Sequence, residues 1–185
     1  MSTPSVTEVL SPWTDFSQIP EDVLEYASWR GTEVHRLCAV YAMGLPIIGE
    51  IPPSCAGFFW SFQAWFDTCV EDVRLVEEEL VHPAYGYHGH PDLIATLRGD
   101  PGPTMIDLKT PSVEAPAWKL QLAGYDELAR ANDMPVIRCG SLMLKRDGGT
   151  AKLKEYIRDG RDIAAFLAAL TAYRYINGEN NGKRS

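Results

Sequence analysis

Two predicted strands joined by a short loop limit the possible folds of this chain more than any other feature. Residues 91–97 and 104–110 are rich in apolar and β-branched side chains, as strands are. The six residues between them, RGDPGP, carry two glycines and two prolines and predict a hairpin loop. A further strand is expected at 74–82, despite its three glutamates. Residues 75–110 are therefore expected to form an antiparallel meander.

A helix and a fourth strand follow the meander. Residues 117–130 have apolar side chains at helical spacing, and residues 136–146 read as a strand. A helix between two strands predicts a crossover that makes the fourth strand parallel to the third. Residues 151–157 are either a short edge strand or the start of a helix. The expected fold class is α/β (α+β), with a central four- to five-stranded mixed sheet flanked by helices.

The remaining helices are expected on both sides of this core. Thr32 is a plausible cap between two of them, and Gly44 should end the second. The segment 55–72 holds the densest aromatic cluster, which is typical of a buried helix face, with Trp60 lying off that face. These helices are predicted at 21–30, 33–43, 55–72 and 159–176.

The composition is that of an ordinary soluble globular protein. The chain has 185 residues, 45% of them hydrophobic and 23% charged, which fits a single domain over residues 1–176. Residues 1–18 read as an extended lead-in and residues 177–185 as a disordered tail. The sequence has no run of about 18 apolar residues and no signal-peptide pattern, so we expect no membrane association and a cytoplasmic location. Four widely spaced cysteines without a CxxC pair predict buried thiols.

Two acids and a lysine stand out at the ends of the predicted hairpin strands. Side chains alternate along a strand, so Asp107 and Lys109 should share one face. Burying such charges costs free energy unless they are paired with other charges or coordinate a metal ion. If Asp92 converges on them, the two carboxylates and the Leu108 carbonyl offer oxygen ligands for Mg²⁺ or Mn²⁺. Lys109 can then orient an attacking water or stabilise the transition state of phosphodiester hydrolysis.

Other polar residues have a structural interpretation beside a functional one. His35 lies at the edge of an apolar helical stripe, where a half-buried, hydrogen-bonded histidine is common. Gln121 and Tyr125 lie four residues apart on one helix face, which also suits a polar flank beside a packed tyrosine. One of the glutamates 77–79 can turn toward the acids, but the sequence does not say which.

Taken together, these residues resemble the PD-(D/E)XK nuclease superfamily, in particular its RecB-like and phage-type exonuclease branch. Pro91-Asp92 is similar to the family's PD and Asp107-Leu108-Lys109 to its (D/E)xK. The segment 31–35 resembles the upstream helix whose histidine assists at the metal. Gln121-Leu122-Ala123-Gly124-Tyr125 resembles the downstream QxxxY motif. The likeness spans about residues 28–145 and implies a restriction-endonuclease-like core.

The resemblance implies roles for these residues. Asp92, Asp107, His35 and the Leu108 carbonyl would bind metal, with Asp92, Asp107, Lys109 and His35 taking part in catalysis. Gln121 and Tyr125 would contact substrate and hold the surroundings of Lys109. The family members with an iron–sulfur cluster carry a trio of cysteines after the QxxxY helix, where this chain has Cys139 alone, so we expect no cluster.

The function implied is a Mg²⁺- or Mn²⁺-dependent DNA exonuclease of phage-recombination or DNA-repair type. It would act on single- or double-stranded DNA ends, alone, as a homo-oligomer or with a recombination partner protein. The net charge of −8 argues against a broad nucleic-acid-coating surface but permits a local basic path. Alternatives are a sequence- or structure-specific endonuclease of the same fold and a catalytically silent DNA-binding subunit. Candidates for the DNA path are the aromatic segment 55–66 and the cations Lys119, Arg130, Lys145 and Arg146.

Overall fold

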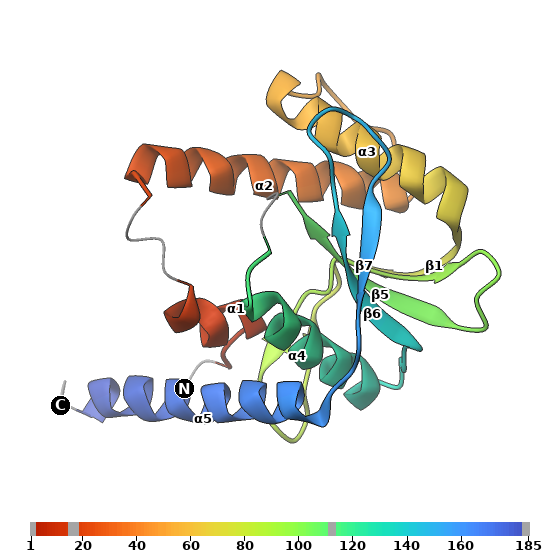
Figure 1. Ribbon diagram of the computed structural model, residues 1–185. Helices are drawn as coiled ribbons and strands as arrows, with labels where there is room; N and C mark the ends of the chain where they lie inside the picture. Colours follow the sequence, from red (N-terminus) through yellow and green to blue (C-terminus); the bar gives the residue numbers. More distant parts are fainter. Residues whose placement is uncertain (1–2, 15–18, 111–113, 183–185) are drawn as a thin grey trace.

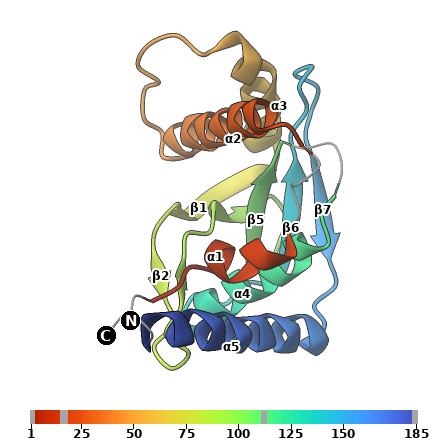
Figure 2. The same ribbon diagram turned by 90° about the vertical axis from the view of Figure 1, so that its left-hand side faces the viewer.

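The computed structural model describes residues 3–14, 19–110 and 114–182. A five-stranded mixed sheet separates two layers of helices, with α2 and α3 on one face and α1, α4 and α5 on the other (Figures 1 and 2). The helices are α1 (Val6–Leu10), α2 (Glu21–Ala42), α3 (Pro53–Cys69), α4 (Ala117–Ala131) and α5 (Gly160–Gly182), with a 3₁₀ turn at Ser11–Trp13. No helix among the described residues combines the length and apolarity that a membrane crossing needs.

The sheet has the order β1-β4-β5-β6-β7 and confirms the predicted mixed fold. Its first three strands pair antiparallel, β5 and β6 pair parallel, and β6 and β7 pair antiparallel. Helix α4 makes the crossover between the parallel strands, as expected. The sheet strands are β1 (Val70–Val76), β4 (Leu93–Leu97), β5 (Pro103–Lys109), β6 (Arg138–Met143) and β7 (Lys152–Tyr156), while β2 (Leu80–Val81) and β3 (His88–Gly89) form a separate pair.

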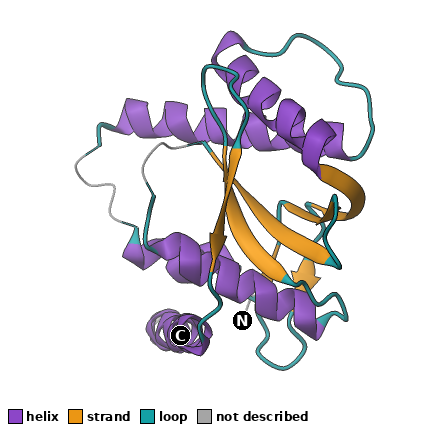
Figure 3. Ribbon diagram, turned by 45° about the vertical axis from the view of Figure 1, so that its right-hand side comes forward, coloured by secondary structure: helices purple, strands orange, loops and turns teal. Residues whose placement is uncertain are grey.

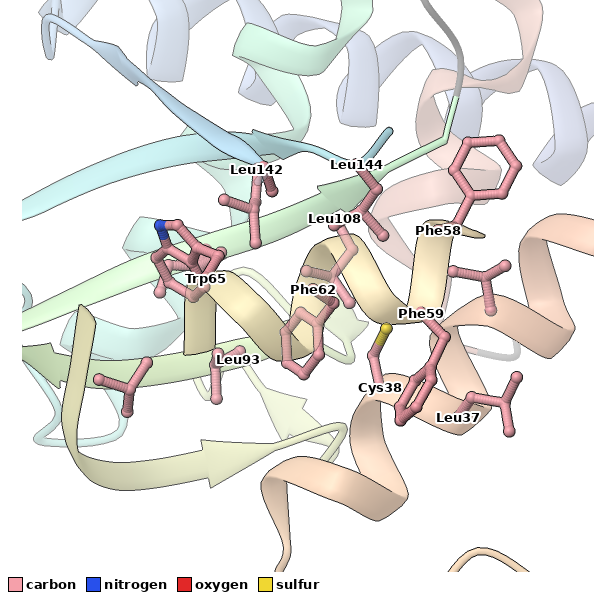
Figure 4. Packing of buried hydrophobic residues seen from close by; sticks show 14 of the residues in the cluster. Leu37, Cys38, Phe58, Phe59, Phe62, Trp65, Leu93, Leu108, Leu142 and Leu144 are labelled. Atoms are coloured by element: carbon pink, nitrogen blue, oxygen red, sulfur yellow. The ribbon is translucent and has the colours of Figure 1, made fainter. Parts of the chain in front are cut away.

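Successive side chains along the strands pack alternately into two hydrophobic clusters, one on each face of the sheet. Leu93 packs on the α2/α3 face, whereas its neighbour Ile94 packs on the α4/α5 face. Helix α3 packs three buried rings on the first face, those of Phe58, Phe59 and Phe62 (Figure 4). Burying one such side chain stabilises the fold by roughly 1.5–3 kcal/mol. The aromatic cluster is therefore core, as its spacing predicted.

Two predictions about the N-terminal region are wrong. Residues 21–42 form one helix rather than two, and Thr32 lies inside it. A glycine in a helix costs roughly 0.5–1 kcal/mol, which the packing of Val34 and Leu37 further along can offset. The lead-in contains α1, because Ser5 and Glu8 form a capping box and the helix buries its apolar residues. Residues 1–2 and 15–18 of that lead-in lie outside the described part.

Two further boundaries differ from the expectation. The strand predicted at 74–82 begins earlier and ends at Val76, because Glu77 has a left-handed backbone with φ 51°. Residues 151–157 resolve to the edge strand β7. Helix α5 continues to Gly182 through part of the expected tail, while residues 183–185, and 111–113 of the linker after β5, lie outside the described residues.

Candidate active site

The predicted site residues lie at the carboxyl end of β5, between α2 and α4. Helix α2 contributes His35 from its middle, and the turn before β4 contributes Asp92. Strand β5 ends on the acid–leucine–lysine triplet because its alternation points Asp107 and Lys109 the same way. Hydrogen bonds and ion pairs link the seven predicted residues in two sets, which meet where Asp107, Leu108 and Lys109 follow one another along β5. The first set is His35, Asp92 and Leu108, and the second is Asp107, Lys109, Gln121 and Tyr125.

Asp92 joins the helix to the strand. Its Oδ2 accepts a hydrogen bond from the Leu108 backbone N–H at 2.6 Å, and its Oδ1 lies 3.2 Å from His35 Nδ1. Burial alone would raise the pKa of this carboxyl, but His35, the Leu108 amide and Lys109 together hold it below its usual value. Asp92 is therefore held as a carboxylate.

His35 bridges Asp92 and the strand backbone. Its Nε2 lies 3.1 Å from the Leu108 carbonyl oxygen, so both ring nitrogens have an oxygen partner. Burial disfavours the charged ring, yet the neighbouring carboxylates of Asp92, Asp107 and Glu77 raise the pKa of His35 to about 9. Without a metal ion, the ring is an imidazolium that donates to both oxygens.

Glu77 is the site residue that the sequence did not single out. Its carboxylate oxygen lies 3.9 Å from His35 Nδ1. Donor atoms of His35, Glu77 and Asp92 all lie within 4.8 Å of one another, which makes this the group in the described residues that could hold a metal ion. Burial and the charge of Asp92 raise the pKa of Glu77 to about 7.

The backbone explains which glutamate enters the site. The left-handed φ at Glu77 and the irregular pairing of β1 redirect the chain where the strand ends. Glu79 points elsewhere and lies 3.0 Å from His88 Nδ1. A run of three glutamates carries no periodic signal for this choice. A left-handed residue at the end of a bulged strand could be found only from the structure.

Lys109 is held on three sides. Its Nζ lies 2.7 Å from Asp107 Oδ2, donates to Gln121 Oε1 at 3.0 Å, and lies 5.1 Å from the centre of the Trp118 ring. The sequence predicts Trp118 only as one of the apolar residues of α4. In the structure its ring makes a cation–π contact that restricts the position of the Lys109 ammonium. The ammonium is therefore fixed in position.

Asp107 is buried at the centre of this arrangement. Burial raises the pKa of its carboxyl, Asp92 adds to that rise and Lys109 opposes it, leaving the pKa at about 6. Ser141 Oγ on the parallel neighbour β6 lies 3.5 Å from Asp107 Oδ2. The site thus holds more carboxylates than cations, and their mutual repulsion is visible in the raised pKa values.

Gln121 and Tyr125 support Lys109 from α4. Gln121 donates to the Tyr125 hydroxyl at 3.4 Å, a long hydrogen bond. Tyr125 is only 5% exposed and packs on Gly89, where an added Cβ would lie 2.6 Å from the ring. The tyrosine therefore buttresses the glutamine, and Gln121 is the member of the pair nearer the charged groups.

The four cations expected along a DNA path lie in two places. Lys145 and Arg146 line an open groove at the carboxyl ends of β5 and β6. Lys119 and Arg130 instead line a smaller cavity of about 220 Å³ between α4 and the start of α5. Trp60 is 55% exposed, as its position off the buried face predicted.

Comparison with known protein families and with curated proteins finds no significant match. Among solved structures, the chain is similar to that of LHK-Exo in complex with dAMP. The alignment covers 99% of this chain and 95% of that one, at 16% sequence identity and a TM-score of 0.45.

Proposed function

We propose that this chain is a divalent-metal-dependent nuclease that hydrolyses phosphodiester bonds in DNA, acting from DNA ends as an exonuclease of phage-recombination or repair type. The observation that supports it most is that two bonded groups, His35 with Asp92 and Asp107 with Lys109, meet at the end of β5, where Leu108 bonds to both His35 and Asp92. These residues come from a helix, a turn and a strand that are far apart in sequence. The nuclease domain would span residues 1–176.

The side chains of the site fit a hard divalent cation. Glu77, Asp92 and Asp107 supply carboxylate oxygens and His35 an imidazole, a set that suits Mg²⁺ or Mn²⁺. Carboxylates that raise one another's pKa are relieved when a cation lies between them. A divalent ion held there supplies Lewis-acid stabilisation of charge on a phosphate group. We assign His35, Asp92 and Asp107, with the Leu108 carbonyl, as its ligands, and add Glu77.

Lys109 has a separate role on the same face. Its ammonium is fixed by Asp107 and Gln121 and stays partly open, with a side chain 13% exposed. A fixed cation is suited to stabilise the negative charge that develops on a phosphate during attack by water. Gln121 acts through Lys109 by accepting one of its hydrogen bonds, and Tyr125 positions Gln121.

Linear and closed circular DNA distinguish the proposal from its alternatives. Incubated with Mg²⁺ or Mn²⁺, the protein should shorten end-labelled linear DNA and leave the closed circle intact. Equal cutting of the circle would instead indicate an endonuclease of the same fold. A protein that binds DNA but cuts neither substrate would be a catalytically silent DNA-binding subunit. Sedimentation of the protein alone distinguishes a monomer from the homo-oligomer that the sequence left open.

A further inference from the structure

An open, basic groove adjoins the proposed active site. Its lining includes Thr110, which directly follows Lys109, and Arg30 and Phe58 from the two helices above the sheet. The remaining wall comes from the β6–β7 hairpin, whose loop rises beside α3 (Figures 1 and 3). The groove therefore meets the site at Thr110, the residue next to Lys109 in the chain.

The charge of the groove is opposite to that of the molecule. Five cations line it against one carboxylate, that of Asp147, whereas the whole chain has a net charge of −8. The cations are Arg30, Lys145, Arg146, Lys152 and Lys154. Of these, only Lys154 forms an ion pair in the part of the chain that the structure describes, with Glu114. A concentration of free cations in an acidic protein indicates a polyanionic ligand.

The hairpin is anchored, so its charges are held in place. The Lys145 backbone N–H donates to Ser61 Oγ of α3 at 3.0 Å. Gly57 of α3 lies so close to the hairpin that an added Cβ would be 1.8 Å from the Arg146 carbonyl oxygen. Backbone anchoring leaves the side chains of Lys145 and Arg146 exposed to the groove.

Aromatic rings stand beside the cations. The Arg30 guanidinium lies 5.3 Å from the Phe58 ring and 5.8 Å from the Tyr26 ring, and its Nε is buried without a hydrogen-bond partner among the described residues. Tyr26 is 50% exposed and stacks on Trp29, which is 49% exposed, with ring centres 5.9 Å apart. The two exposed rings lie beyond the lining of the groove and connect to it through Arg30. Aromatic rings near basic side chains are a pattern by which proteins hold unpaired bases.

We propose that this groove binds a single strand of DNA, with phosphates on the β6–β7 cations and bases on Tyr26 and Trp29. The inference rests on the proposed function, because it assigns a strand path to that same site. On this proposal, DNA reaches Lys109 as an unpaired strand. A duplex hides its base faces in the stack and would gain nothing from the exposed rings.

The test is a salt series of binding measurements on the full chain carrying Asp107→Asn, which blocks cleavage. Anisotropy of labelled oligothymidylate gives Kd for this protein and for Arg146→Gln/Lys152→Gln added to it. The double substitution in the groove, called the groove pair, should raise Kd about tenfold. It should also flatten the slope of log K against log salt by about 1.4, since each phosphate contact on a single strand contributes about 0.7. Tyr26→Ala should raise Kd roughly tenfold for the single strand.

The matched control is Arg161→Gln/Arg174→Gln, which removes two positive charges from α5 on the other side of the sheet. It should leave Kd within about twofold. Equal effects of the two pairs, no effect of the groove pair, or tighter binding of duplex than of single strand would each overturn the strand path. Cleavage is read separately on the protein without Asp107→Asn. Groove-dependent binding without any Mg²⁺-dependent cleavage would contradict the proposed function alone, whereas cleavage with groove-independent binding would contradict this inference alone.

Discussion

The His35 ring is protonated at neutral pH, whereas its proposed role as a metal ligand requires a free lone pair on a ring nitrogen. Its pKa of about 9 comes from neighbouring carboxylates that outweigh its burial, and the same cluster leaves Glu77 at about 7. A histidine whose pKa is higher in the folded than in the unfolded protein stabilises the fold. This contribution is complete below the unfolded pKa of about 6.5 and is lost as the pH rises through the folded pKa of about 9. In the protein without metal, the positive charge of the His35 ring partly offsets the repulsion between the neighbouring carboxylates.

Metal binding should therefore release protons. At pH 7 both His35 and part of the Glu77 population are protonated, so Mn²⁺ should displace at least about one proton and bind more tightly as the pH rises from 6 to 9. Calorimetry in two buffers of different ionisation enthalpy measures that number. His35→Gln should release fewer protons. Proton-neutral binding by the unmutated protein would exclude His35 as a ligand.

Gln121 should affect turnover more than binding. Gln121→Met keeps the volume but removes the acceptor that fixes Lys109, and a displaced catalytic group costs about tenfold to a hundredfold in rate. We expect kcat on linear DNA to fall by that amount while KM and the free energy of unfolding change little. A loss confined to KM would mean that Gln121 contacts substrate instead.

The sequence predicted the contacts that depend on local spacing. Two residues along a strand bring Asp107 beside Lys109, and four along a helix bring Gln121 near Tyr125. The place of Glu77 depends on one left-handed residue after a bulged strand, and the contact of Trp118 with Lys109 depends on how α4 docks. Neither leaves a trace in local spacing.

At the scale of elements, the long periodic helices and strands were predictable, whereas helix boundaries and the short helix α1 were not. The meander, α3, α4 and the parallel crossover follow from hydrophobic pattern and loop composition. The break expected at Gly31 does not exist, because packing of the second half of α2 outweighs one poor helix former. Helix α1 has five residues, too few for a periodic signal, and depends on its capping box and on burial against α4 and α5.

Two glycines test this account of the helices. Gly31→Ala meets no atom within 4 Å and should stabilise the protein by about 0.5–1 kcal/mol. Gly57→Ala drives a methyl group into the Arg146 carbonyl and should destabilise it by about 1–3 kcal/mol or more. Urea unfolding of both variants supplies the comparison. A Gly57→Ala protein as stable as Gly31→Ala would mean that α3 does not approach the β6–β7 hairpin so closely.

At the scale of the whole molecule, the site lies between the two helix layers. Helix α2 supplies His35 from one layer and α4 supplies Gln121 from the other, with Lys109 at the end of β5 between them. The basic groove lies along α2, α3 and the β6–β7 hairpin. The net charge of −8 is compatible with the proposed DNA substrate, because the proposed metal ion would offset the acids of the site and the groove concentrates cations.

Release of nucleotides from linear DNA tests the central claim most directly. In Mg²⁺ or Mn²⁺ the unmutated protein should release acid-soluble nucleotides, and chelation by EDTA should stop the release. Lys109→Met should lower the rate at least about a hundredfold, whereas Arg161→Met, which removes an exposed cation from the start of α5, should leave the rate within about twofold. Undiminished release by Lys109→Met, or release that persists in EDTA, would contradict the assignment of this cluster as a metal-dependent nuclease site.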